Sequence, residues 1–97
     1  MVCGDFNATL DLPSAQCMAR VFRPTQTAPT AFTPLQDRDG TVSHPYWARW
    51  DRCIDYLWVA GPLTICASGV CFDTPSADDA TLWPSDHVGV WADLAFI

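Results

Sequence analysis

The run RCIDYLWVAG, residues 52–61, constrains the fold of this chain more than any other segment. It is rich in Ile, Tyr, Leu, Trp and Val, the residue types enriched in β-strands, and the pair Gly61-Pro62 at its end is a turn signal. One acid, Asp55, interrupts the apolar side chains. A buried carboxylate is costly unless it is paired. The run therefore predicts a core strand that carries one partnered acid.

Strands dominate the rest of the prediction. We expect the end of a buried strand at residues 1–4, one or two strands at 63–72, and a strand from residue 88 onwards. In the last of these strands, small and apolar side chains alternate with a more polar set that includes Trp91 and Asp93. This alternation predicts that one face of the strand is more exposed to solvent than the other. Only one short helix is expected, at about residues 14–21.

Two segments lack any such pattern. Residues 23–47 hold four of the eight prolines and many threonines, and they predict a long irregular stretch. Loops of this length in compact domains are usually functional or mobile. Residues 73–85, DTPSADDATLWPS, predict a second, acidic loop. Its Trp83 directly precedes residues 84–87, PSDH, and could line the pocket of a site formed there.

Composition narrows the class of protein. With 97 residues, 49% of them hydrophobic and 16% charged, the chain is a single folded domain at most, or a piece of a larger fold. All 11 acids are Asp, and the sequence contains no Glu and no Lys. The net charge of -6 argues against a nonspecific binder of nucleic-acid backbones, which needs a basic surface. A small phosphorylated substrate held by a metal is less disfavoured.

The cysteines and the N-terminus exclude further classes. There are five cysteines and no CxxC pair, which is unlike a disulfide framework or a zinc ribbon. Cys53, Cys66 and Cys71 lie among apolar residues and are predicted to be small buried side chains. No signal peptide and no membrane-spanning run is present. A cytoplasmic location is expected if Met1 is the true start.

Polar residues stand at the ends of, or within, three predicted strands. Asp5 and Asn7 follow the first strand, Asp55 lies inside the second, and Asp86 and His87 come directly before the last. Strands side by side in a sheet can bring such groups together at one edge. Carboxylates bind Mg²⁺ and leave room for water and phosphate, and an Asp can fix the tautomer of a His. The pattern therefore favours metal-assisted phosphoryl transfer.

Three motifs carry a family resemblance. GDFNAT (4–9), RCIDYLWV (52–59) and WPSDHVGVWADL (83–94) resemble consecutive motifs of the endonuclease/exonuclease/phosphatase family, the deoxyribonuclease I-like phosphoesterases. Each motif alone is weak, but their order is specific. The resemblance implies an α/β (α+β) fold, part of a two-sheet α/β sandwich with its N-terminal half missing. Residues 1–97 would then be the C-terminal portion of a single domain.

The resemblance also implies roles for individual residues. Asp5 matches an acid that orients the nucleophilic water and helps to bind metal, and Asn7 matches an amide that contacts phosphate. Asp55 matches the partner of the catalytic histidine, and His87 matches that histidine. Asp86 matches an acid of the metal site. The implied cofactor is Mg²⁺, with Mn²⁺ as an alternative, and the implied reaction is hydrolysis of a phosphate mono- or diester.

The departures from the family pattern are informative. The resemblance implies a metal-binding glutamate and a second histidine upstream of GDFN; this chain has no Glu, and His44 follows GDFN. We therefore expect an incomplete phosphoesterase with low or no activity alone, whose substrate is weakly more suited to a small molecule than to nucleic acid. The alternative is a non-catalytic remnant, or a half-domain that depends on a partner to supply the missing half.

Simpler interpretations stay open for each candidate residue. Asp5 and Asn7 could form an ordinary turn, because both residue types favour turns. Asp55 could be a structural acid paired with Arg49 or Arg52. Asp86 could cap a loop, and His87 could be an ordinary surface histidine.

Overall fold

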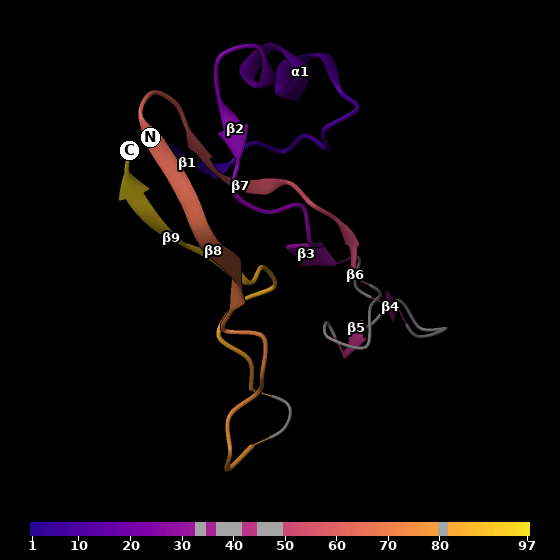
Figure 1. The fold of residues 1–97 in the computed structure, drawn as a ribbon. Helices are drawn as coiled ribbons and strands as arrows, with labels where there is room; N and C mark the ends of the chain where they lie inside the picture. Colours follow the sequence, from indigo (N-terminus) through magenta and orange to yellow (C-terminus); the bar gives the residue numbers. More distant parts are fainter. Residues whose placement is uncertain (33–34, 37–41, 45–49, 80–81) are drawn as a thin grey trace.

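The computed structural model describes residues 1–32, 35–36, 42–44, 50–79 and 82–97. The described part is mixed α/β, with antiparallel strands and one short helix (Figure 1). The elements in chain order are β1 (Val2–Asp5), α1 (Pro13–Ala19), β2 (Arg23–Pro24), β3 (Ala31–Phe32), β4 (Leu35–Gln36), β5 (Val42–His44), β6 (Trp50–Arg52), β7 (Asp55–Val59), β8 (Leu63–Cys71) and β9 (Gly89–Phe96).

The central sheet has the strand order β1-β7-β2, with both outer strands antiparallel to β7. Trp58 of β7 lies opposite Val2 on one side and Pro24 on the other. Strand β7 alternates half-buried and buried residues at its start and ends on two buried residues, Trp58 and Val59. The predicted core strand at 52–61 is thus confirmed, although the strand itself is shorter.

Strands β8 and β9 form a long antiparallel hairpin, from Leu63 opposite Phe96 to Cys71 opposite Gly89. Residues 63–72 therefore hold one strand, and the predicted alternation of the last strand is confirmed. Trp91, Asp93 and Ala95 are exposed, and the residues between them are half-buried. The loop that joins the two strands extends away from α1 (Figure 1).

The core is small and centred on β7. Among the described residues, the largest fully buried side chains are those of Tyr56, Trp58, Val59 and Thr30. Phe6 packs edge-on against Tyr56 and Trp58, with ring centroids 5.8 and 6.0 Å apart. The aromatic side chains therefore join the loop after β1 to the central strand.

Helix α1 is close to the segment predicted at 14–21. It has Pro13 in its first turn, where the missing N–H of proline does no harm. It ends at Ala19, and Arg20 is the C-cap residue. The N–H of Arg20 donates to Cys17 O, and the N–H of Val21 donates to Met18 O. Ala15 is its buried residue and faces the core.

Three expectations need correction. Residues 1–4 do form a strand, but all four residues of β1 are exposed, because β1 is an edge strand of the sheet. Cys66 is exposed rather than buried, whereas Cys53 and Cys71 are half-buried. The stretch 23–47 is not wholly irregular, since it contains the short strands β2 to β5 in its described parts.

The molecule is thin. Its extents are 51 × 32 × 14 Å, and its radius of gyration is 15.6 Å. A compact domain of this length has a radius of gyration of about 12 to 13 Å. No helix in the described ranges is long and apolar enough to cross a membrane.

Candidate active site

Asp55 and His87 form a close polar pair at one end of the central sheet. Nδ1 of His87 lies 2.7 Å from Oδ2 of Asp55, across 32 residues of sequence. The His87 side chain is 30% exposed and that of Asp55 is 13% exposed, so the pair is shielded yet reachable from solvent. A turn fixes the approach of His87, because its backbone N–H donates to Oγ of Ser85 at 3.1 Å.

Asp5 reaches the same place from β1. It is the last residue of that strand, and its Cα is paired with that of Asp55 across the sheet. The backbone N–H of Asn7 donates to Oδ1 of Asp5 at 2.8 Å, and Asn7 has a left-handed φ of 51°. Asn tolerates this conformation better than most residues. Residues 5–7 therefore form a turn, and this turn holds the Asp5 carboxylate at the end of the strand.

These three side chains form one group. The ligand atoms of Asp5, Asp55 and His87 all lie within 4.8 Å of one another. Two carboxylates directly opposite each other on neighbouring strands repel, so the arrangement calls for a positive charge. An imidazolium or a bound cation would supply it.

Asp86 precedes His87 in the chain but lies outside this group. Asp86 is exposed, and its Oδ1 accepts a hydrogen bond from Oγ of Ser85 at 3.3 Å. The backbone bends at Asp86, and the negative charge of Asp86 lies close enough to help raise the pKa of His87. Of the four Asp and His residues predicted from sequence, the structure thus brings three into one cluster.

The charges around His87 act on its protonation. Partial burial, the largest single effect, lowers the pKa of His87. The hydrogen bond to Asp55 and the negative charges of Asp55, Asp86 and Asp5 together outweigh burial, so the pKa of His87 is raised above its ordinary value of 6.5. The imidazole therefore keeps its proton to higher pH than a free histidine does.

Supporting contacts that the sequence did not reveal hold the site together. Oη of Tyr56 lies 2.9 Å from Ala8 O and 2.6 Å from Cys53 O, which ties the loop after Asp5 to the segment before Asp55. Nε2 of Gln26 donates to Asp55 O at 3.2 Å. Thr30 is a third such residue, because its Oγ1 accepts a hydrogen bond from the backbone N–H of Asp55. A single sequence carries no signal for these roles, because they arise from tertiary contacts.

Comparison with known proteins decides the family. The family model described as the endonuclease/exonuclease/phosphatase family matches residues 1–87. The chain belongs to this family. Membership implies a phosphoesterase or nuclease type of function in general, and the mixed α/β fold is consistent with part of the expected sandwich. No curated protein and no solved structure matches the chain significantly.

The donor set of this family member fits a hard divalent cation. Carboxylate oxygens are the ligands that Mg²⁺ and Mn²⁺ prefer, and Asp5 offers an exposed carboxylate within 4.8 Å of Asp55 and His87. Asp55 Oδ2 is already engaged by His87, so Asp5 is the member of the group best placed to bind an ion. The family is generally metal-dependent, which agrees with this chemistry.

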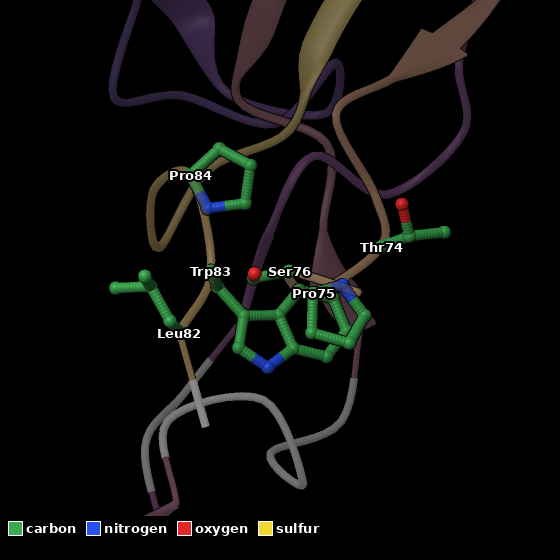
Figure 2. A pocket seen from close by; sticks show the side chains of 6 residues that line it. All are labelled: Thr74, Pro75, Ser76, Leu82, Trp83 and Pro84. Carbon is green, nitrogen blue, oxygen red and sulfur yellow. The ribbon is translucent and has the colours of Figure 1, made fainter. Parts of the chain in front are cut away.

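A pocket opens in the loop that leads to His87. It has a volume of about 410 Å³ and is lined by Thr74, Pro75, Ser76, Leu82, Trp83 and Pro84. Figure 2 shows the Trp83 indole among the side chains of Pro75 and Leu82. The lining of the pocket is mostly apolar. Trp83 lies four residues before the candidate catalytic histidine. Asp5, Asp55 and His87 are not among the residues that line this pocket, so the expectation that Trp83 lines the pocket of the candidate site is not confirmed.

Proposed function

We propose that the chain carries the aspartate–histidine part of a divalent-metal-dependent phosphoesterase site. It would hydrolyse a phosphate mono- or diester. Water attacks phosphorus, the P–O ester bond breaks and the alcohol is released. The observation that carries the proposal is the convergence of Asp5, Asp55 and His87 within 4.8 Å in a member of this family. The cofactor we propose is Mg²⁺, with Mn²⁺ as an alternative.

Each residue has a role that follows from its contacts. Oδ2 of Asp55 accepts a hydrogen bond from Nδ1–H of His87, which leaves Nε2 as the nitrogen that exchanges a proton with the substrate or stabilises its charge. Asp5 orients the attacking water and, with Asp86 as a candidate second ligand, holds the cation. Asn7 provides neutral hydrogen bonds to phosphate. When bound, the cation would polarise the phosphoryl oxygen and lower the pKa of water.

A small phosphoester is the better-supported substrate class. The net charge of -6 disfavours a long anionic polymer. The apolar pocket beside Trp83 could receive the organic part of a small substrate. Both observations favour a small substrate. A polymeric substrate would need a basic surface supplied by another chain.

A second candidate function is a half-site that needs a partner. The sequence contains no Glu, so the glutamate ligand implied by the family pattern is not among its residues. The fold is thin, and β1 is an exposed edge strand to which another strand could add. We therefore expect the activity of the isolated chain to be low.

The test is hydrolysis of bis(4-nitrophenyl) phosphate by the purified chain. We expect release of nitrophenolate that needs Mg²⁺ or Mn²⁺ and falls by about 10²- to 10⁴-fold in His87→Ala, the range for loss of a general acid or base. His44→Ala is the matched control, because it removes the chain's other histidine. It should leave the rate unchanged.

Two results would count against the proposal. Hydrolysis that survives EDTA would exclude a metal-dependent site. Hydrolysis that is equal in His87→Ala and in the unaltered chain would exclude a role for His87. A folded chain that releases no nitrophenolate with either metal would favour the partner-dependent half-site.

A further inference from the structure

Thr30 is a fully buried polar residue that bonds to the backbone of Asp55 and of the residue after His87. Its Oγ1 accepts the backbone N–H groups of Ile54, at 3.1 Å, and of Asp55, at 3.0 Å. Its carbonyl oxygen accepts the N–H of Val88 at 2.9 Å, one residue after His87. Thr30 itself is 0% exposed.

The backbone around Thr30 strengthens this connection. The Thr30 N–H donates to Arg52 O at 2.8 Å, and Ala31 forms an isolated antiparallel bridge with His87. Residues 30–31 therefore lie between the segment that carries Asp55 and the segment that carries His87. These two segments are far apart in sequence, and residues 30–31 bond to the backbone of both.

The hydroxyl is chemically specific to this task. A hydroxyl oxygen has two lone pairs, which matches the two N–H groups aimed at it. Valine has the same shape but no acceptor, so it would leave both buried N–H groups without a partner. Serine keeps the oxygen and loses only a methyl group.

We propose that Thr30 is a positioning residue, whose hydroxyl holds the Asp55 backbone so that the carboxylate meets Nδ1 of His87. Thr30 touches neither metal nor substrate and acts through Asp55. The catalytic consequence rests on the proposed phosphoesterase function, whereas the geometric claim stands without it. Displacement of a catalytic group by about 1 Å can slow a reaction by about 10²-fold.

The first readout is the ring N–H proton of His87, observed by NMR in the metal-free chain after ¹⁵N-histidine labelling. Only two imidazoles are present, so His87→Asn assigns the signal. We expect a slowly exchanging, downfield Nδ1–H in the unaltered chain and in Thr30→Ser. We expect it to be lost or exchange-broadened in Thr30→Val.

Thr25→Val is the matched control. Thr25 is also buried, at 7% exposure, and its Oγ1 has no hydrogen-bond partner in the described part of the chain. The same substitution there removes a hydroxyl without removing such a bond. It should leave the His87 signal intact. An unchanged signal in folded Thr30→Val, or equal loss in both valine variants, would overturn the proposal.

The second readout is hydrolysis. Thr30→Val should lower kcat by about 10²-fold with little change in KM, and Thr30→Ser should restore most of it. If no variant hydrolyses the ester but the His87 signal behaves as expected, the proposed function fails and the positioning role stands. Loss of kcat that serine does not restore would overturn the role of the hydroxyl.

A measurement on the unaltered chain covers the case in which Thr30→Val does not fold. The amides of Ile54 and Asp55 should be protected from hydrogen exchange, because both donate to the buried Thr30 Oγ1. Exchange of these amides as fast as that of the exposed loop amide of Thr74 would contradict the proposal.

Discussion

Asp55→Asn is expected to lower kcat for phosphodiester hydrolysis by about 10²- to 10⁴-fold, with the fold retained. The carboxylate of Asp55 accepts a hydrogen bond from Nδ1–H of His87, with 2.7 Å between Oδ2 and Nδ1. An amide can present its NH₂ group instead, which would place the histidine proton on the wrong nitrogen. The steady-state rate of nitrophenolate release measures this effect.

The same variant should change the pH dependence. Burial lowers the pKa of His87, and the hydrogen bond and charge of Asp55 are the main effects that raise it. Asp55→Asn should therefore move the titration of His87 to lower pH. Because the folded-state pKa of the unaltered chain is raised, the stabilisation from the pair is fully present below the unfolded value of about 6.5 and is lost as pH rises through the folded value.

Asp93→Asn provides the control for Asp55→Asn. Asp93 is an exposed acid on β9, so the same loss of one negative charge should leave kcat and the His87 titration unchanged. If Asp55→Asn titrates and hydrolyses like the unaltered chain, the account of the Asp55–His87 pair is wrong.

Trp58→Ala is expected to destabilise the chain by about 3–5 kcal/mol, the range for deleting a buried aromatic side chain. Trp58 is fully buried in the central strand. Its ring centroid lies 5.0 Å from that of Tyr56 and 6.0 Å from that of Phe6. Domains have about 5–15 kcal/mol of stability in total, so the variant should lose a large fraction of it. Urea unfolding followed by far-UV circular dichroism measures this.

Two further tryptophan variants separate packing from other causes. Trp91→Ala removes a side chain that is 40% exposed, and should cost only about 1 kcal/mol. Trp58→Phe keeps much of the ring and removes an Nε1–H that has no hydrogen-bond partner within the described ranges, so it should cost less than Trp58→Ala. Equal destabilisation by Trp58→Ala and Trp91→Ala would contradict a core centred on β7.

The elements that sequence predicted well are those with long, regular patterns. The strand at β7 has a dense run of β-branched and aromatic residues, and β9 alternates between half-buried and exposed residues from Val90 to Ala95. Strands β2 to β5 have two or three residues each, which is too short for any periodicity to show. The exposure of β1 depends on its place at the sheet edge, which its four residues do not encode.

The candidate site was predictable in its chemistry and only partly in its geometry. Asp55 was marked by its place in an apolar strand, and Asp5 and His87 by their motifs. That Asp86 lies outside the cluster is a matter of tertiary geometry, which its place beside His87 in the sequence does not reveal. Thr30 is one of many threonines in its stretch, and only the folded chain reveals its contacts.

The most direct test of the central claim is Mn²⁺-induced broadening of backbone amide signals in the isolated chain, which needs no catalytic activity. At substoichiometric Mn²⁺ we expect the amides of Asp5, Asp55 and His87 to broaden first, those of α1 to remain sharp, and excess Mg²⁺ to reverse the effect. Asp5→Asn should abolish the broadening. Broadening confined to the acidic loop at Asp78 and Asp79, or spread evenly over the chain, would show that no metal binds beside these three residues.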